Sequence, residues 1–122
     1  MDPRVFRRVQ RYGWDAATDA YDRGWVPLIE GLTASCVARA APQAGERVLD
    51  LATGPGVGAF VAARAVGAAG LVTGIDVSEK MVVRASLRAA SAGVGNVCSG
   101  ATTWRPPARP TARSTRSPAG SG

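Results

Sequence analysis

The sequence contains no histidine and only two cysteines, Cys36 and Cys98. Zinc and other transition metals draw most of their ligands from these residue types, and two isolated cysteines form neither a metal-binding pattern nor a disulfide framework. We therefore expect no metal centre and reduced thiols. No apolar run approaches the roughly 20 residues that a membrane span needs, and none follows the N-terminal arginines as a secretory signal requires. These absences predict a soluble cytoplasmic protein.

Acidic residues and large aliphatic residues are both absent after residue 97. Residues 98–122 contain no Asp, Glu, Val, Leu, Ile, Met or Phe, but four arginines, which account for four of the six net positive charges of the 122-residue chain. A segment of this composition cannot bury a hydrophobic core. The sequence thus divides into an N-terminal helical segment at 1–45, a compact part at 46–97 and a disordered Arg/Pro/Ser-rich tail at 98–122.

Strand and helix patterns alternate in the compact part. The predicted elements are one or two short helices at 1–24, a helix that starts at Pro27, a strand at 47–52, a helix at 57–66, a strand at 71–76 and a helix at 79–92 capped by Ser78. The strand at 47–52 is apolar on both faces, as buried parallel strands tend to be. Asn96 and Val97 begin a third strand, which the next residues cannot continue. This order predicts an α/β fold with a parallel sheet, truncated after the second strand and the start of the third.

The most informative segment runs from Val48 to Gly58, where an apolar strand ends on Asp50 and opens into a glycine-rich loop. Glycine has no Cβ, so such a loop can bend tightly and bring its backbone N–H groups against a ligand. The second strand also ends on a carboxylate, Asp76. A glycine loop after one strand and an acid at the end of the next are typical of the nucleotide-binding half of an α/β sheet.

These motifs identify a family. Residues 9–97 resemble the N-terminal half of a class I S-adenosylmethionine-dependent methyltransferase, a Rossmann-like fold, in the branch of the ubiquinone and menaquinone C-methyltransferases. The segment 75–81 is similar to the second motif of that family, and Tyr21-Asp22 with Trp25 is similar to its N-terminal helix region. The first motif, acid-x-Gly-x-Gly-x-Gly, falls on Asp50, Ala52, Gly54 and Gly56, with alanine in place of the first glycine.

The resemblance implies S-adenosylmethionine as the cofactor, with its amino-acid end at the first motif. Backbone groups from Ala52 through Gly54 to Gly56 would approach this end, which the absence of side chains permits. Asp50 would lie beneath the loop and help to hold the ammonium group of the cofactor.

The remaining part of the cofactor is assigned to the second motif and the N-terminal helix. Asp76 would accept hydrogen bonds from both ribose hydroxyls, as the equivalent acid does in dinucleotide folds. Val77 and Met81 would flank the adenine, and Tyr21 would close over the site. The reaction implied is methyl transfer to a small-molecule acceptor. The acceptor pocket lies in the C-terminal half of the family, so no catalytic residue is assigned here, and the oligomeric state is left open.

Several of these residues also have a structural interpretation. Asp50 can cap the following helix, and Tyr21 and Met81 can serve packing alone. A nicotinamide dinucleotide enzyme is the chemical alternative, because Gly54-x-Gly56-x-x-Ala59 fits the Rossmann fingerprint. In that fingerprint the first glycine follows the strand almost at once, whereas here residues 50–53 lie between the apolar run and Gly54. This spacing argues against the dinucleotide alternative. A non-catalytic fragment that binds cofactor or another protein is a further alternative.

The tail has two interpretations. Its residue types are those of GC-rich codons, and reading a permitted back-translation of 98–122 from the third base gives a methyltransferase-like continuation with a DGxFDxV strand. This pattern indicates a frameshift just after Val97, which would leave the chain truncated and inactive. The other interpretation is a basic arm that contacts nucleic-acid phosphates. Trp104 is the single aromatic residue available for stacking on bases, so we expect no nucleic-acid partner.

Overall fold

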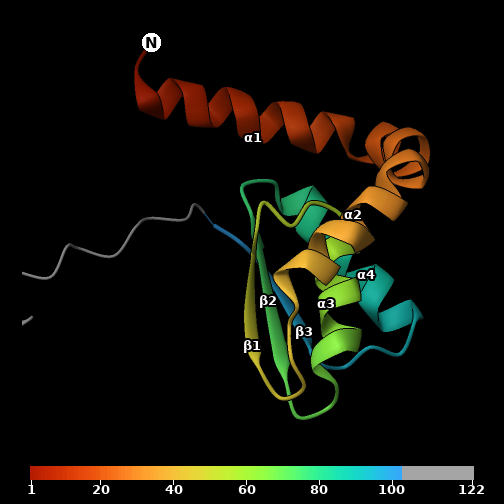
Figure 1. Ribbon diagram of the computed structural model, residues 1–122. Helices are drawn as coiled ribbons and strands as arrows, with labels where there is room; N and C mark the ends of the chain where they lie inside the picture. Colours follow the sequence, from red (N-terminus) through yellow and green to blue (C-terminus); the bar gives the residue numbers. More distant parts are fainter. Residues whose placement is uncertain (103–122) are drawn as a thin grey trace, which may run out of the picture.

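The structure is a computed structural model that describes residues 1–102 (Figure 1). Its three strands form one parallel sheet in the order β1-β2-β3. The α/β fold with a parallel sheet, predicted from the alternating pattern, is therefore confirmed. The elements in chain order are α1 (Pro3–Ala20), η1 (Tyr21–Trp25), α2 (Val26–Ala40), β1 (Arg47–Leu51), α3 (Val57–Val66), β2 (Leu71–Asp76), α4 (Glu79–Ser91) and β3 (Val97–Ala101).

The hydrophobic core lies between α3 and one face of the sheet. Val72 of β2 is fully buried and aligns with Val48 and Val97 on the neighbouring strands. The alanine-rich face of α3 packs on this row, with Ala59, Ala62, Ala63 and Val66 all buried. Small side chains let the helix approach the sheet closely. Figure 1 shows α2, α3 and α4 on the same side of the sheet.

The opposite face of the sheet is exposed in the described part of the chain. Side chains alternate along a strand, and the alternate residues of β1, Leu49 and Leu51, are 54% and 47% exposed. The prediction that the first strand is buried on both faces is therefore wrong. An apolar run shows that a strand can be covered on both sides, but within residues 1–102 the helices α2, α3 and α4 lie on the other side of the sheet.

The N-terminal region folds differently from the prediction of one or two short helices. Pro3–Ala20 forms a single helix of 18 residues, which continues through a π-helical segment, η1, into α2. Pro27 lies in the first turn of α2, as predicted. Single π-helical turns occur frequently at functional sites, and η1 supplies Tyr21 to the site described below.

The third strand is longer than predicted. It runs from Val97 to Ala101 and pairs in register with Val72–Asp76 of β2. A parallel ladder is built from backbone groups, so the small residues Ser99 and Gly100 do not prevent pairing. The predicted boundary of the tail at residue 98 is thus wrong for 98–101, and 103–122 lie outside the described residues.

Candidate functional site

A cleft of about 590 Å³ opens at the carboxyl ends of β1 and β2, beneath the C-terminal half of α1. Parallel strands place their carboxyl ends at one edge of a sheet, where α/β folds bind ligands. Six of the eight predicted site residues line this cleft: Tyr21, Ala52, Gly54, Asp76, Val77 and Met81. The structure thus brings together residues from α1–η1, the glycine loop and α4. Their contacts with a cofactor stay predictions.

The glycine loop turns through three residues in the left-handed region. Gly54 and Gly56 have φ values of +55° and +87°, and Ala52 has +55°. A Cβ on Gly56 would lie 2.8 Å from Cβ of Ala85 in α4, so both the backbone conformation and the packing require glycine there. Ala52 adopts a similar conformation with a side chain, at the position where the family carries glycine.

Asp76 fastens the glycine loop to the start of α4. Its Oδ2 accepts a hydrogen bond from the backbone N–H of Gly54 at 2.8 Å, and its Oδ1 accepts a hydrogen bond from the backbone N–H of Ser78 at 2.9 Å. Each carboxylate oxygen has a second lone pair. Asp76 can therefore hold the loop and still accept hydrogen bonds from a ligand in the cleft. Ser78 caps α4 as predicted, with its hydroxyl accepting from the N–H of Met81.

Asp50 lies beside the cleft rather than in it. It lines an adjoining cavity of about 160 Å³ that shares Tyr21, Ala52 and Gly54 with the cleft. The hydroxyl of Thr53 donates to Asp50 Oδ2 at 2.7 Å, which orients the carboxylate beneath the loop. The N-cap of α3 is Gly56 and receives no side-chain cap, so the alternative that Asp50 caps this helix is not observed.

Two aromatic residues close the cleft from the N-terminal side. Trp14 and Tyr21 contact each other edge to face, with ring centroids 5.8 Å apart at 87°, and both line the cleft. Tyr21 was predicted at this place, whereas Trp14 was not singled out as a site residue. Their spacing of seven residues puts them on one side of a helix, and this spacing was the available signal.

Met81 belongs both to the core and to the wall of the cleft, while its contact with an adenine stays a prediction. Its side chain is 2% exposed and so belongs to the core, yet it also forms part of the cleft wall beside Val77.

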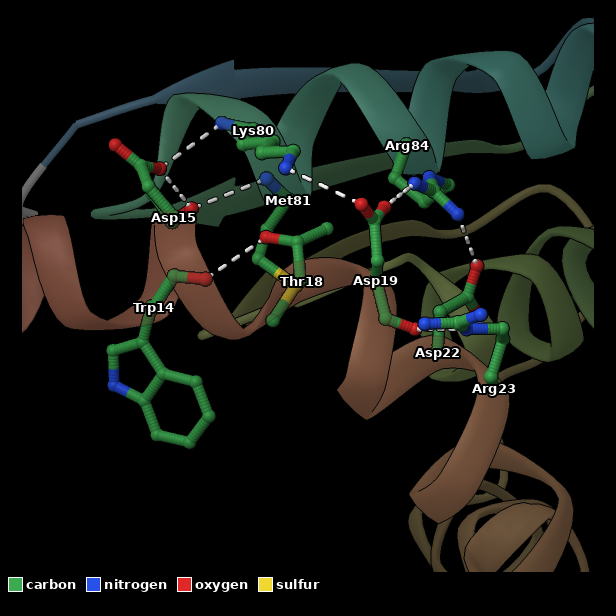
Figure 2. A network of polar contacts seen from close by, with 10 residues as sticks. Trp14, Asp15, Thr18, Asp19, Asp22, Arg23, Lys80, Met81 and Arg84 are labelled. Carbon is green, nitrogen blue, oxygen red and sulfur yellow. Dashed lines mark hydrogen bonds and ion pairs between the residues drawn. The ribbon is translucent and has the colours of Figure 1, made fainter.

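Acidic residues of α1 and η1 contact polar and basic residues at the start of α4 (Figure 2). Asp15 accepts hydrogen bonds from the hydroxyl of Ser78 and, at 3.2 Å, from the backbone N–H of Lys80. Asp19 pairs with Lys80 at 3.5 Å and also with Arg84. The positive charge of Lys80, aided by the hydrogen bond from Arg84, lowers the pKa of the Asp19 carboxyl.

The same contacts continue toward the glycine loop. Asp22 pairs with Arg84 at 3.1 Å and with Arg88, and Arg88 also donates to the carbonyl of Pro55 at 3.0 Å. These ion pairs join the N-terminal helix, α4 and the loop, and they hold Trp14 and Tyr21 over the cleft. The three acids are spaced i, i+4 and i+7, and the basic residues of α4 that they contact, at 80, 84 and 88, are four residues apart. These matching spacings are the only sign of the contact in the sequence, and they are weak evidence for it.

Neither a metal site nor a membrane span occurs in the described residues. No group of three or more His, Cys, Asp or Glu side chains within residues 1–102 is arranged to hold a metal ion. No helix in the same range is long and apolar enough to cross a membrane.

Comparisons with known proteins point to methyltransferases. Residues 42–99 match a family described as a methyltransferase domain. Over 97 residues the chain is 32% identical to the aklanonic acid methyltransferase DauC of Streptomyces sp. (strain C5), a match that covers 80% of this chain and 44% of that protein.

Two solved structures illustrate the structural similarity. An S-adenosylmethionine-dependent methyltransferase from Aquifex aeolicus is 30% identical with a TM-score of 0.54, over 58% of this chain and 38% of that one. A Haemonchus contortus phosphoethanolamine N-methyltransferase, solved with phosphoethanolamine and S-adenosylhomocysteine, is 20% identical with a TM-score of 0.67. This match covers 84% of this chain and 22% of that one. The second similarity shows the fold alone. The chain spans less than half the length of each relative.

Proposed function

We propose that the cleft beneath α1 binds S-adenosylmethionine, because residues 42–99 match a methyltransferase domain and the chain is 30% identical to an S-adenosylmethionine-dependent methyltransferase from Aquifex aeolicus over the part that it covers. The observation that carries this proposal is the position of Asp76, which holds the N–H of Gly54 and of Ser78 at the mouth of the cleft. A carboxylate fixed in this way is ready to accept hydrogen bonds from the two hydroxyls of a ribose.

The described residues fit the two ends of this cofactor. Val77 and Met81 offer an apolar wall to the adenine, and the left-handed glycine loop exposes backbone groups to the amino-acid end. Asp50, oriented by Thr53, supplies negative charge for the ammonium group from the adjoining cavity. When bound, the cofactor supplies an electrophilic methyl group on a sulfonium. Trp14 and Tyr21 exclude water from one side of it.

We propose further that the methyl acceptor is a small molecule. The Streptomyces relative is, by its name, a methyltransferase of aklanonic acid, and this supports an acceptor of small size. Methyl transfer depends on placing the acceptor in line with the sulfonium methyl. The acceptor atom and the residues that orient it are not part of this proposal.

We also propose that the 122-residue chain does not turn over by itself. A parallel sheet is stable when both of its faces are covered, and here Leu49 and Leu51 are about half exposed on the face opposite the helices. We expect the chain to bind the cofactor weakly and to need further structure for catalysis. Multiple turnovers by the purified chain would contradict this part of the proposal.

Calorimetric titration of the full chain with S-adenosylmethionine tests the binding. We expect saturable binding of S-adenosylmethionine and none of NAD⁺. Asp76→Asn should weaken binding at least tenfold, because the amide cannot accept from both backbone N–H groups and the ribose.

The matched control is Glu30→Gln, the same change on an exposed residue of α2, which should leave binding unaltered. Far-UV circular dichroism checks that both variants fold. Binding of NAD⁺ in place of S-adenosylmethionine would reject the proposed function in favour of a dinucleotide enzyme.

A further inference from the structure

A second hollow of about 590 Å³ lies beside the cleft, between the N-terminal half of α1 and the carboxyl ends of β2 and β3. We refer to it as the arginine groove, because one wall consists of Arg4, Arg7, Arg8 and Arg11. Val77 and Thr102 belong to both the arginine groove and the cleft. The two hollows are therefore neighbours along the edge of the sheet.

The arginines face the body of the protein. Their spacing places them on one side of α1, and the same side carries Asp15 and the buried Thr18 one and two turns further on. The apolar residues Val5 and Val9 lie on another side and are 47% and 55% exposed. An amphipathic helix ordinarily buries its apolar stripe. Here the N-terminal half of α1 directs guanidinium groups at the groove instead.

The positive charge of the groove is only partly compensated. Among the described residues, Glu79 is the one carboxylate that lines it, and Glu79 is already paired with Arg11 at 3.2 Å. Arg4, Arg7 and Arg8 form no ion pair within residues 1–102. Several guanidinium groups around one concave surface create a positive potential that attracts anions.

We propose that the arginine groove binds a phosphate-bearing anion with several negative charges, such as a diphosphate group. The planar guanidinium matches phosphate oxygens through paired hydrogen bonds. A single carboxylate would leave most of the positive charge uncompensated, whereas a diphosphate can engage three guanidinium groups at once. The volume is in the range of small-molecule sites, about 300–1,000 Å³. This site adjoins the proposed cofactor cleft, with which it shares Val77, but the anion that it binds takes no part in the proposed methyl transfer.

The test is a calorimetric titration of the full chain with inorganic pyrophosphate. We expect saturable binding that weakens at least tenfold in the double variant Arg7→Gln/Arg8→Gln. The matched control is Arg109→Gln/Arg113→Gln, which removes the same charge from 98–122 and should change the affinity less than twofold. Binding should also weaken between 50 mM and 200 mM salt, because exposed charges are screened. Circular dichroism establishes that both variants retain their helices.

Each other outcome overturns the proposal. An absence of pyrophosphate binding to the folded chain would reject the site. Equal losses in the two double variants would attribute binding to net charge alone. Adsorption to phosphatidylglycerol vesicles or to an RNA oligonucleotide, without affinity for pyrophosphate, would assign the arginines to a membrane or a nucleic-acid surface. A failed titration with S-adenosylmethionine would leave this result intact, so the two proposals fail independently.

Discussion

At the residue scale, Ala52 is the clearest departure from the family pattern. It occupies the left-handed region with φ +55°, where a residue with a Cβ is less stable than glycine by about 1 kcal/mol. The family motif carries glycine at this position, so the alanine adopts this backbone conformation at a cost in stability. The backbone path of the loop is thus retained even though the residue best suited to it has been replaced.

Ala52→Gly is therefore expected to raise the free energy of unfolding by up to about 1 kcal/mol, because the strain removed exceeds the entropy that glycine adds to the unfolded chain. Urea denaturation measures the change. The control is Ala65→Gly, the same substitution at an exposed position inside α3, which should lower the unfolding free energy by about 1 kcal/mol. A destabilising effect of Ala52→Gly would contradict the assignment of strain.

The positions of the loop glycines and of Asp76 at the end of β2 follow from the sequence, because they depend on short-range geometry; their contacts with a cofactor stay predictions. It does not predict Trp14, because the relation of Trp14 to the cleft depends on how α1 docks. Asp50 is an intermediate case. Its place under the loop was predicted from the resemblance, and its hydrogen bond from Thr53 is visible only in the structure.

At the element scale, ion pairs attach α1 and η1 to α4, and their members differ in exposure. The side chain of Asp22 is 13% exposed and that of Asp19 is 51% exposed. Exposed ion pairs contribute little to stability, whereas breaking a more buried pair leaves an uncompensated charge. Asp22→Asn should consequently destabilise the chain more than Asp19→Asn in urea denaturation. Equal losses of unfolding free energy in the two variants would show that burial does not determine how much each ion pair stabilises the chain.

The pH dependence of the Asp19 contact has a definite sign. Its pKa is lowered in the folded state by Lys80 and Arg84, so its contribution is present above the unfolded pKa, about 3.9, and is lost as the pH falls through the folded value. The difference in unfolding free energy between the wild type and Asp19→Asn should shrink as the pH falls from 6 to 3. A difference that is constant over this range would rule out the ion pair as its cause.

Element boundaries were predictable where local signals are strong. The helix at Val57–Val66 and the strand at Leu71–Asp76 agree with the predicted ranges, since glycines and a strand-ending acid bound them. The single long α1 and the full length of β3 were missed. Both depend on partners distant in sequence, α4 for the helix and β2 for the strand.

At the scale of the whole molecule, the core is on one side of the sheet. Val72 is fully buried under α3, while Leu49, on the opposite face of the neighbouring strand, is 54% exposed. Val72→Ala should cost about 2 kcal/mol of unfolding free energy, and Leu49→Ala less than about 1 kcal/mol. Urea denaturation of both variants measures this. A large cost at Leu49 would indicate that something covers the face that is open here.

The interpretation of 98–122 as an out-of-frame segment stays a prediction. Residues 98–101 pair with β2, and a backbone ladder forms with many sequences, so this pairing does not distinguish the two interpretations. Sequencing the coding DNA from Gly93 onward is the direct test. An alternative frame that continues as a methyltransferase would support a frameshift, and a frame without such a continuation would reject it.

The most direct test of the central claim is an NMR titration of the ¹⁵N-labelled chain with S-adenosylhomocysteine, the product form of the cofactor. We predict saturable shifts of the backbone amides at 52–54, 56 and 76–81 and of the indole N–H of Trp14, because these groups lie in or directly beside the cleft. Asp76→Asn should abolish the shifts while Glu30→Gln preserves them. Shifts confined to other parts of the folded chain, or none at saturating ligand, would contradict a cofactor site between the glycine loop, Asp76 and the N-terminal helix.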